Sequence, residues 1–258
     1  MNDNTPIIGF NDIFVKKDCD FFKGGVCGTR GRMIYTIMER LHNANYKQVV
    51  YACGREDVDL ALVAVASDEF AMQRCDIFTP TGEKTVVMNC MEVVNDRVTY
   101  HQVPNGYSNV LNARARDFSF GDSDRVMIPM GFVCRVAVET VMHQCTAIPK
   151  DVRRIVVYDE SGVTVAGIMA GLSYYGRSDI SVLGITSKSE PYGVIARIFG
   201  VGILDKPSVN MQYNRVGRVT VNDEVDYAGI KLHTQSDARC VKYLDKGDML
   251  WVCGNKVF

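Results

Sequence analysis

One segment near the middle of the chain reads as a buried strand, a tight turn and a helix in direct succession. Residues 155–157 are apolar and β-branched, residues 159–162 are small, acidic or hydroxylic, and residues 163–172 have the composition of a buried helix. Such a turn points backbone N–H groups, here together with two hydroxyls, at one spot on the positive end of a helix dipole. The segment therefore predicts an α/β fold with an anion site, most naturally for a phosphate. The residues assigned to that site are Ser161, Gly162, Val163 and Thr164.

Strands and helices alternate along most of the sequence, which implies a mostly parallel sheet with right-handed crossovers. Strands are expected at residues 48–52, 74–79, 86–90, 98–102, 155–158, 180–185 and 219–226. Helices are expected at residues 33–43, 60–66, 107–118, 133–144 and after the turn at 159–162.

Composition places the chain among ordinary globular proteins. It has 258 residues, of which 47% are apolar and 23% charged, enough for one large α/β domain or two lobes. The net charge of −1 argues against a general nucleic-acid or membrane-surface binder. No signal peptide or membrane span is visible, so a cytoplasmic location is expected. The nine cysteines contain no CxxC pair and the four histidines are scattered, so no metal site is expected.

Five segments, in this order, resemble one enzyme family. They are residues 14–18 (Phe-Val-Lys-Lys-Asp), the glycine-punctuated loop at 24–32, residues 104–110 (Pro-Asn-Gly-Tyr-Ser-Asn-Val), the loop at 161–167 and the strand at 182–185. Together they resemble the fold-type II pyridoxal-phosphate enzymes, on the branch of 1-aminocyclopropane-1-carboxylate (ACC) deaminase and D-cysteine desulfhydrase.

The resemblance implies a two-lobed, three-layer α/β/α fold with mostly parallel sheets. Residues 1–44 and 121–258 would form a larger lobe that carries the phosphate loop, and residues 45–120 a smaller lobe. Pyridoxal phosphate would lie between the lobes, its phosphate on the loop at 161–167 and Tyr107 among its contacts. Family members are commonly dimers, so a homodimer is expected.

Two departures from the family pattern change what the resemblance implies. The family forms an imine with the cofactor through a lysine in the first glycine-rich loop, where this chain has Arg30 or, in the other alignment, Gly28. Neither forms an imine, because arginine stays protonated and glycine has no side chain. Lys23 lies a few residues upstream and is the alternative amine.

The second departure is the acidic stretch at residues 54–59. The family has Ser, Asn or Gln there to bind a substrate carboxylate, whereas Glu56 and Asp57 would repel one. Acids at a helix N-terminus also cap the helix, so capping is the alternative, purely structural role of these residues. With Arg30, Asp159 and Glu160, they complete the set of candidate catalytic residues.

Four functions remain open at this point. The first is a divergent member of the fold that binds a phosphorylated small molecule without imine chemistry. The second is a phosphosugar or nucleotide transferase like the phosphoribosyltransferases, in which Asp159 and Glu160 bind ribose hydroxyls and residues 161–164 bind the phosphate. The third is an active pyridoxal-phosphate deaminase or lyase. The fourth is a non-catalytic partner subunit.

Overall fold

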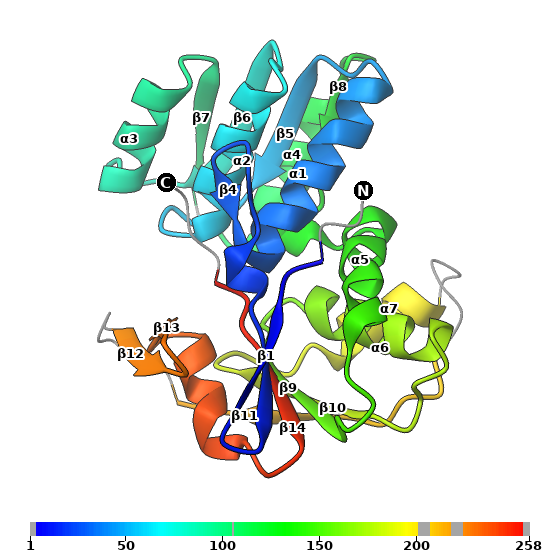
Figure 1. Cartoon of the computed structure of the whole chain (residues 1–258). Coiled ribbons are helices and arrows are strands. Elements are labelled where there is room, and N and C mark those ends of the chain that lie inside the picture. The colour runs from blue at the N-terminus through cyan, green and yellow to red at the C-terminus, as the bar shows by residue number, and fades with distance from the viewer. Residues whose placement is uncertain (1–3, 105, 201–206, 218–223, 255–258) are drawn as a thin grey trace. The chain divides into compact units, whose positions relative to one another are not determined.

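The protein is described by a computed structural model that covers residues 4–104, 106–200, 207–217 and 224–254. Its contacts divide the chain into two compact units (Figure 1). Among the described residues, the first unit consists of 4–21, 27–29 and 133–254, and the second of 22–26 and 30–132. The structure thus groups 22–26, 30–44 and 121–132 with the second unit, where the sequence expectation had them in the larger lobe. The reason is local pairing: the strand at 125–127 joins the second unit's sheet, and Tyr35 packs edge-on against Phe70 at 4.9 Å.

The first unit is built on a six-stranded sheet in the order β1-β2-β14-β9-β10-β11. The hairpin of β1 and β2 is antiparallel, and the other pairs are parallel. The last strand among the described residues, β14, lies between β2 and β9 in the middle of the sheet. The strand bounds are β1 Ile7–Phe10, β2 Ile13–Lys16, β9 Arg154–Tyr158, β10 Ser181–Thr186, β11 Met211–Arg215 and β14 Asp248–Trp251.

Helices α5 (Arg135–Met142) and α6 (Val163–Tyr174) pack closely in this unit. Glycine permits the close approach, because a Cβ on Gly167 would lie 2.5 Å from the Cβ of Val141. The unit also contains α7 (Tyr192–Gly200), the hairpin of β12 (Glu224–Tyr227) and β13 (Ile230–His233), and short 3-10 helices. The 3-10 helices of this unit are η1 Asp18–Asp20, η3 His143–Ala147 and η4 Asp237–Tyr243. Of the strand expected at 219–226, residues 219–223 lie outside the described part, and 224–226 belong to β12.

The second unit has a four-stranded, fully parallel sheet in the order β7-β6-β5-β8, covered on both faces. Val50 and Ala52 pack with Leu111 of α4, whereas Tyr51 points the other way and bonds to Asp59 of α2. The strands are β5 Gln48–Ala52, β6 Arg74–Pro80, β7 Val98–Val103 and β8 Arg125–Met127. The helices are α1 Gly28–Asn43, α2 Val58–Glu69, α3 Val86–Val94 and α4 Ser108–Ser119, and the first two residues of α1 group with the first unit. The short elements are β3 Phe22–Lys23, β4 Val26–Cys27 and η2 Met130–Phe132. The α/β fold class with mostly parallel sheets, expected from the sequence, is confirmed.

One expected element has the wrong type. Residues 86–90, expected as a strand because of their valines, begin the helix α3. Thr85 caps this helix, its Oγ1 accepting the N–H of Met88 at 3.3 Å, and Met88 and Met91 are buried one turn apart. β-Branched residues lower helix propensity only slightly, so the cap and the tertiary packing decide the outcome. Among the described residues, no helix is both long and apolar enough to cross a membrane.

Candidate functional site

The strand–turn–helix expected from the sequence is present at the carboxyl end of β9. Gly162 is the one loop residue in the left-handed region, with φ of 82°, and helix α6 begins at Val163. Val163 is therefore helical, and its β-branched side chain meets no positive-φ penalty. Thr164 is buried within the first turn of the helix. The four predicted loop residues are thus contiguous around one helix N-terminus.

The N–H groups of this loop already hold an anion, which is the side chain of Asp159 (4% exposed). Its Oδ1 accepts the backbone N–H groups of Ser161 and Gly162, each at 3.0 Å, and its Oδ2 accepts that of Val165 at 2.9 Å. The hydroxyls of Ser161 and Tyr213 donate to the same carboxylate at 3.1 and 3.2 Å. A carboxylate so placed satisfies the donors that a bound phosphate would otherwise use.

Tyr213 belongs to the same buried group. Burial, together with the neighbouring carboxylate of Asp159, raises the pKa of the Tyr213 hydroxyl far above its ordinary value. The phenol therefore stays protonated and donates its hydrogen bond at every physiological pH. Its ring also fills the space above Gly184, where a Cβ would lie 2.3 Å from Cε1.

Glu160 is held by a second set of partners. Tyr158 Oη donates to its Oε1 at 2.6 Å, Ser187 Oγ donates to the same oxygen, and Lys188 Nζ lies 2.6 Å from Oε2. Burial alone would raise the pKa of Glu160, but the hydrogen bonds from Lys188, Ser187 and Tyr158 outweigh it and hold the pKa below its ordinary value. Glu160 is thus an ionised, internally paired carboxylate rather than a base waiting for a substrate proton.

Gly28, one of the two positions aligned with the family's lysine, packs against the backbone of residues 253–254, which follow β14. Its φ is 74°, and a Cβ would lie 2.3 Å from the carbonyl oxygen of Cys253 and 2.5 Å from that of Gly254. The neighbouring Thr29 N–H donates to the same Cys253 carbonyl at 2.9 Å. Because backbone rather than a movable side chain fills this space, the position is closed to a lysine.

Arg30, the other aligned position, lies in a buried network of the second unit. Its guanidinium donates from Nε and Nη2 to the two carboxylate oxygens of Asp59 and lies over the ring of Phe132, 4.7 Å from its centroid. Tyr51 Oη also donates to Asp59, at 2.8 Å, and accepts the N–H of Gly131 at 3.2 Å. Burial and the negative charge of Asp59 raise the pKa of Tyr51 well above its ordinary value. Arg30 is thus fully used in holding α1 to α2.

The remaining candidates of the second unit do not gather around Arg30. Asp57 caps α2 by accepting the N–H of Asp59 at 3.1 Å, in agreement with the capping interpretation. Glu56 is exposed, and Tyr107 is 74% exposed at the start of α4. Asp59, the buried partner of Arg30, was not assigned a site role from the sequence. Its signal is its position as the second residue of a helix whose next seven residues are all apolar.

Two lysines, Lys16 and Lys23, lie in or next to the segments that resemble the family. Lys23 has its Nζ 4.4 Å from the centroid of the Tyr35 ring, within the second unit. Lys16, at the carboxyl end of β2, is fully buried, and its Nζ donates to the carbonyl of Thr5 at 2.8 Å and to Gln144 Oε1 at 3.3 Å. Sequence reasoning used Lys16 only to support the family resemblance. In the part of the chain that the structure covers, no group of three or more His, Cys, Asp or Glu is arranged to hold a metal ion.

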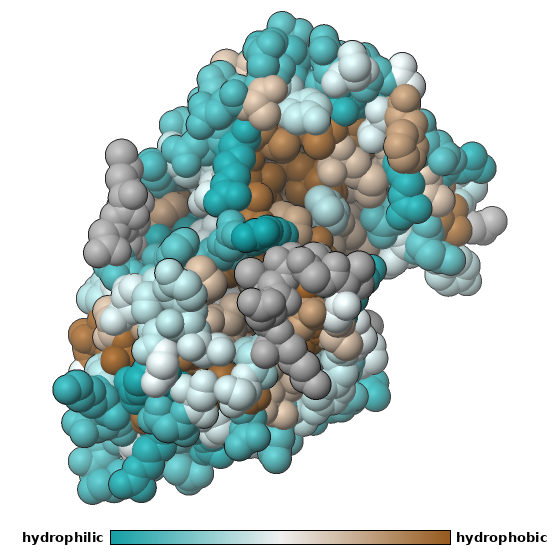
Figure 2. Space-filling view, turned by 90° about the vertical axis from the view of Figure 1, so that its right-hand side faces the viewer, coloured by the Kyte–Doolittle hydropathy of each residue, from teal (hydrophilic) through white to brown (hydrophobic). Residues whose placement is uncertain are grey.

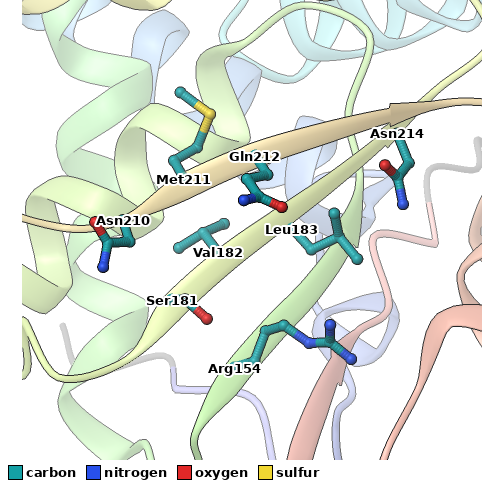
Figure 3. A pocket seen from close by; sticks show the side chains of 8 residues that line it. All are labelled: Arg154, Ser181, Val182, Leu183, Asn210, Met211, Gln212 and Asn214. Atoms are coloured by element: carbon teal, nitrogen blue, oxygen red, sulfur yellow. The ribbon is translucent and has the colours of Figure 1, made fainter.

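A cavity of about 560 Å³ lies along strands β9, β10 and β11 of the first unit, and its lining includes no residue of the Asp159 loop (Figure 3). Arg154, Ser181 and Met211, three of its lining residues, are the first residues of β9, β10 and β11. Ligands of parallel α/β sheets bind beyond the carboxyl ends of the strands, whereas this cavity runs along the sheet from these first residues to Asn214. Arg154 is also occupied, since its guanidinium pairs with Asp248 and Asp245.

The comparisons with known proteins agree on the fold. No protein-family model and no curated protein matches the sequence. Among solved structures, an ACC deaminase homologue has a TM-score of 0.71 at 15% identity, covering 94% of this chain and 84% of its own. O-acetylserine-dependent cystathionine beta-synthase from Helicobacter pylori has a TM-score of 0.65 at 12% identity, covering 99% and 94%. Diaminopropionate ammonia lyase from Escherichia coli has 0.65 at 9%, covering 98% and 83%. These neighbours are fold-type II pyridoxal-phosphate enzymes, and this chain has their fold.

Proposed function

We propose that this chain is a non-catalytic member of the fold, one that keeps the architecture of the pyridoxal-phosphate enzymes and has given up the cofactor. The observation that carries this proposal is the Asp159 carboxylate, which accepts three backbone N–H groups at the start of α6. A cofactor phosphate would have to displace a buried anion that is already fully hydrogen-bonded there. The residues of the loop therefore do not fit pyridoxal phosphate in the arrangement that the structure has.

The environment of Gly28 supports the same proposal. A lysine at this position would place its Cβ on the backbone carbonyls of Cys253 and Gly254. The alternative position, Arg30, carries a guanidinium that cannot form an imine and is paired with Asp59. The deaminase and lyase interpretation lacks its nucleophilic amine at both aligned positions.

The two interpretations that involve a phosphorylated ligand are supported to different degrees. In a phosphoribosyltransferase-like site, Asp159 and Glu160 would face ribose hydroxyls, but both carboxylates have internal partners, so the structure offers this function no support. Binding of a phosphorylated small molecule keeps one argument in its favour, because the loop does converge on a single anion. It would require Asp159 to leave. The non-catalytic member of the fold therefore remains the proposal, and the phosphorylated ligand is the second candidate function.

The experiment compares wild type with Asp159→Ala, which vacates the loop, by thermal shift and calorimetry against pyridoxal phosphate, ribose 5-phosphate and inorganic phosphate. Wild type is expected to show no stabilisation by any of the three and no visible absorbance from an imine. Asp159→Ala is expected to gain affinity for all three, because its N–H groups are then unpaired.

Glu160→Ala is the matched control, since it removes the neighbouring acid and leaves the loop N–H groups with Asp159. It should behave like wild type toward all three ligands. A wild-type protein that binds pyridoxal phosphate with a visible imine band refutes the proposal. Wild-type binding of ribose 5-phosphate without pyridoxal phosphate would favour the phosphorylated-ligand function instead.

A further inference from the structure

The side chain of Arg239 is a buried cation in the first unit. Arg239 is 9% exposed and belongs to η4, which packs on β9, β13 and β14 and follows the β12–β13 hairpin (Figure 1). Apolar side chains that reach the surface, such as those on the side of the molecule shown in Figure 2, are ordinary in folded proteins. A buried charge is different, because its removal from water costs free energy unless the charge is paired.

The hydrogen bonds of this guanidinium use only part of it. Nε donates to the carbonyl of Thr234 at 3.2 Å, and Nη2 donates to the carbonyl of Gly217 at 2.6 Å. Nη1 is buried and has no hydrogen-bond partner. The ring of Tyr158 lies 6.0 Å from Cζ, at the outer limit of a cation–π contact. Arginine does not lose its proton at physiological pH, so this charge is not removed by neutralisation.

The carboxylates of the same region have other partners. Asp237, two residues earlier in η4, accepts the two backbone N–H groups of residues 253–254. Glu160 is paired with Lys188 at 2.6 Å. Among the residues that the structure describes, none forms an ion pair with Arg239. The guanidinium therefore has carbonyls and an aromatic ring around it, and no counter-ion.

Arg239 lies where ligands of parallel sheets bind. Tyr158 is the last residue of β9, and Gly217 lies two residues beyond the end of β11. Ligands of open α/β sheets bind in the crevice beyond these carboxyl ends. A buried donor without an acceptor at such a place is the feature expected of a site whose anion comes from outside the chain.

We infer that Arg239 binds a small organic monocarboxylate at the carboxyl ends of β9 and β11. A planar carboxylate matches the planar N–H fork of a guanidinium, and its single charge neutralises the single charge of Arg239. Glu160 and Lys188 already neutralise each other, so a dianion such as sulfate would bring one negative charge in excess.

This site is separate from the substrate site that the family resemblance implies, which is the loop at 54–59 of the second unit. It is also independent of the role of Asp159, and neither test decides the other. Because Nη1 is closed to solvent, the ligand enters during local opening, so each protein is incubated with the anion before measurement.

The first test compares wild type, Arg239→Met and Arg153→Met by thermal shift in acetate and in chloride at equal ionic strength. Acetate at about ten times its dissociation constant should raise the melting temperature of wild type by about 4 °C over chloride, and should not do so for Arg239→Met. Arg153→Met is the matched control, because Arg153 is an exposed arginine of the same unit, and it should respond like wild type. General salt effects act on all three proteins, so the difference between proteins reports the site.

The second test does not depend on the folding of Arg239→Met. Calorimetry compares wild type with Arg239→Lys, which keeps the charge and loses the fork, and acetate should bind Arg239→Lys about tenfold more weakly. In wild type labelled with nitrogen-15, acetate should shift the side-chain N–H signals of one arginine in a saturable way, whereas sulfate should not.

Three results would overturn the inference. The first is a wild type that does not respond to acetate, which would leave Arg239 with only a structural role on the carbonyls of Thr234 and Gly217. The second is an equal response of wild type and Arg239→Met, which would place acetate elsewhere. The third is binding of chloride or sulfate to wild type as tightly as acetate, which would refute the assignment to a carboxylate.

Discussion

Asp159 shows how one side chain can occupy the N–H groups of a loop that would otherwise bind a phosphate. A helix N-terminus with Ser, Gly and Thr offers donors for an anion, and the residue just before the turn supplies that anion from within the chain. The sequence places an acid beside the loop, and the resemblance to the enzyme family places a phosphate there. Which of these two anions occupies the loop depends on whether the Asp159 carboxylate turns back onto the N–H groups of the loop. That in turn depends on a few backbone dihedral angles and on the hydrogen bond from Tyr213 of a distant strand.

Asp237 carries a prediction at the same scale. Burial raises its pKa to about 6, against the opposing effect of N–H groups from Cys253 and Gly254 at 3.1 and 3.0 Å. Its neutral form is favoured in the folded protein, so its stabilising contribution is complete below about pH 4 and is lost as the pH rises through about 6. We expect the stability of wild type relative to Asp237→Asn to fall by about 3 kcal/mol between these limits. Urea unfolding at a series of pH values measures this; a constant or rising difference would contradict it.

At the scale of the element, α3 shows how little a short apolar run says about its own conformation. Its exposed apolar residues outnumber its two buried ones, so the apolar pattern in the sequence does not mark the face that points into the unit. The cap at Thr85 does more: its Oγ1 accepts the N–H of Met88 and donates to the carbonyl of Arg55 at 3.2 Å. Long, strongly patterned elements such as β5, β6, β9 and β10 were predicted with their type and approximate bounds, because their apolar runs are flanked by turn residues.

Thr85→Ala tests the importance of that cap. Loss of the side-chain acceptor leaves an N–H of the first turn without its partner and should lower the free energy of unfolding by about 1 kcal/mol. Thr85→Ser keeps the hydroxyl and should lie close to wild type. The comparison is made by urea unfolding of the three proteins, and equal stability of Thr85→Ala and wild type would show that α3 is held by its packing alone.

For the molecule as a whole, the position of β14 is decisive. It is the last strand among the described residues, yet it pairs with β2 and β9 in the middle of the six-stranded sheet, and Met249, Leu250 and Trp251 are fully buried. The first unit's sheet therefore joins the beginning and the end of the chain, and its pairings are among the most non-local in the protein.

Deleting residues 248–258 should abolish cooperative folding of the first unit, because β2 and β9 would lose their common neighbour. Thermal unfolding by circular dichroism and limited proteolysis of residues 133–247 would report this. Deletion of the edge strand β1 alone is the control and should destabilise the first unit less than deletion of β14. Native-like melting of the protein without β14 would contradict the prediction.

The sequence by itself determined that this chain is an α/β protein with parallel sheets, where most of its strands and helices lie, and that its central segment is a strand, a turn and a helix. These follow from periodicity, composition and turn chemistry, which act over a few neighbouring residues. Only the tertiary structure decided what the residues do. That Asp159 fills the loop, that Gly28 meets the carbonyl of Cys253, that Arg30 pairs with Asp59 and that α3 turns valines outward all depend on contacts between distant segments. Local patterns restrict the backbone, whereas partners for charge and space are set by which segments the fold brings together.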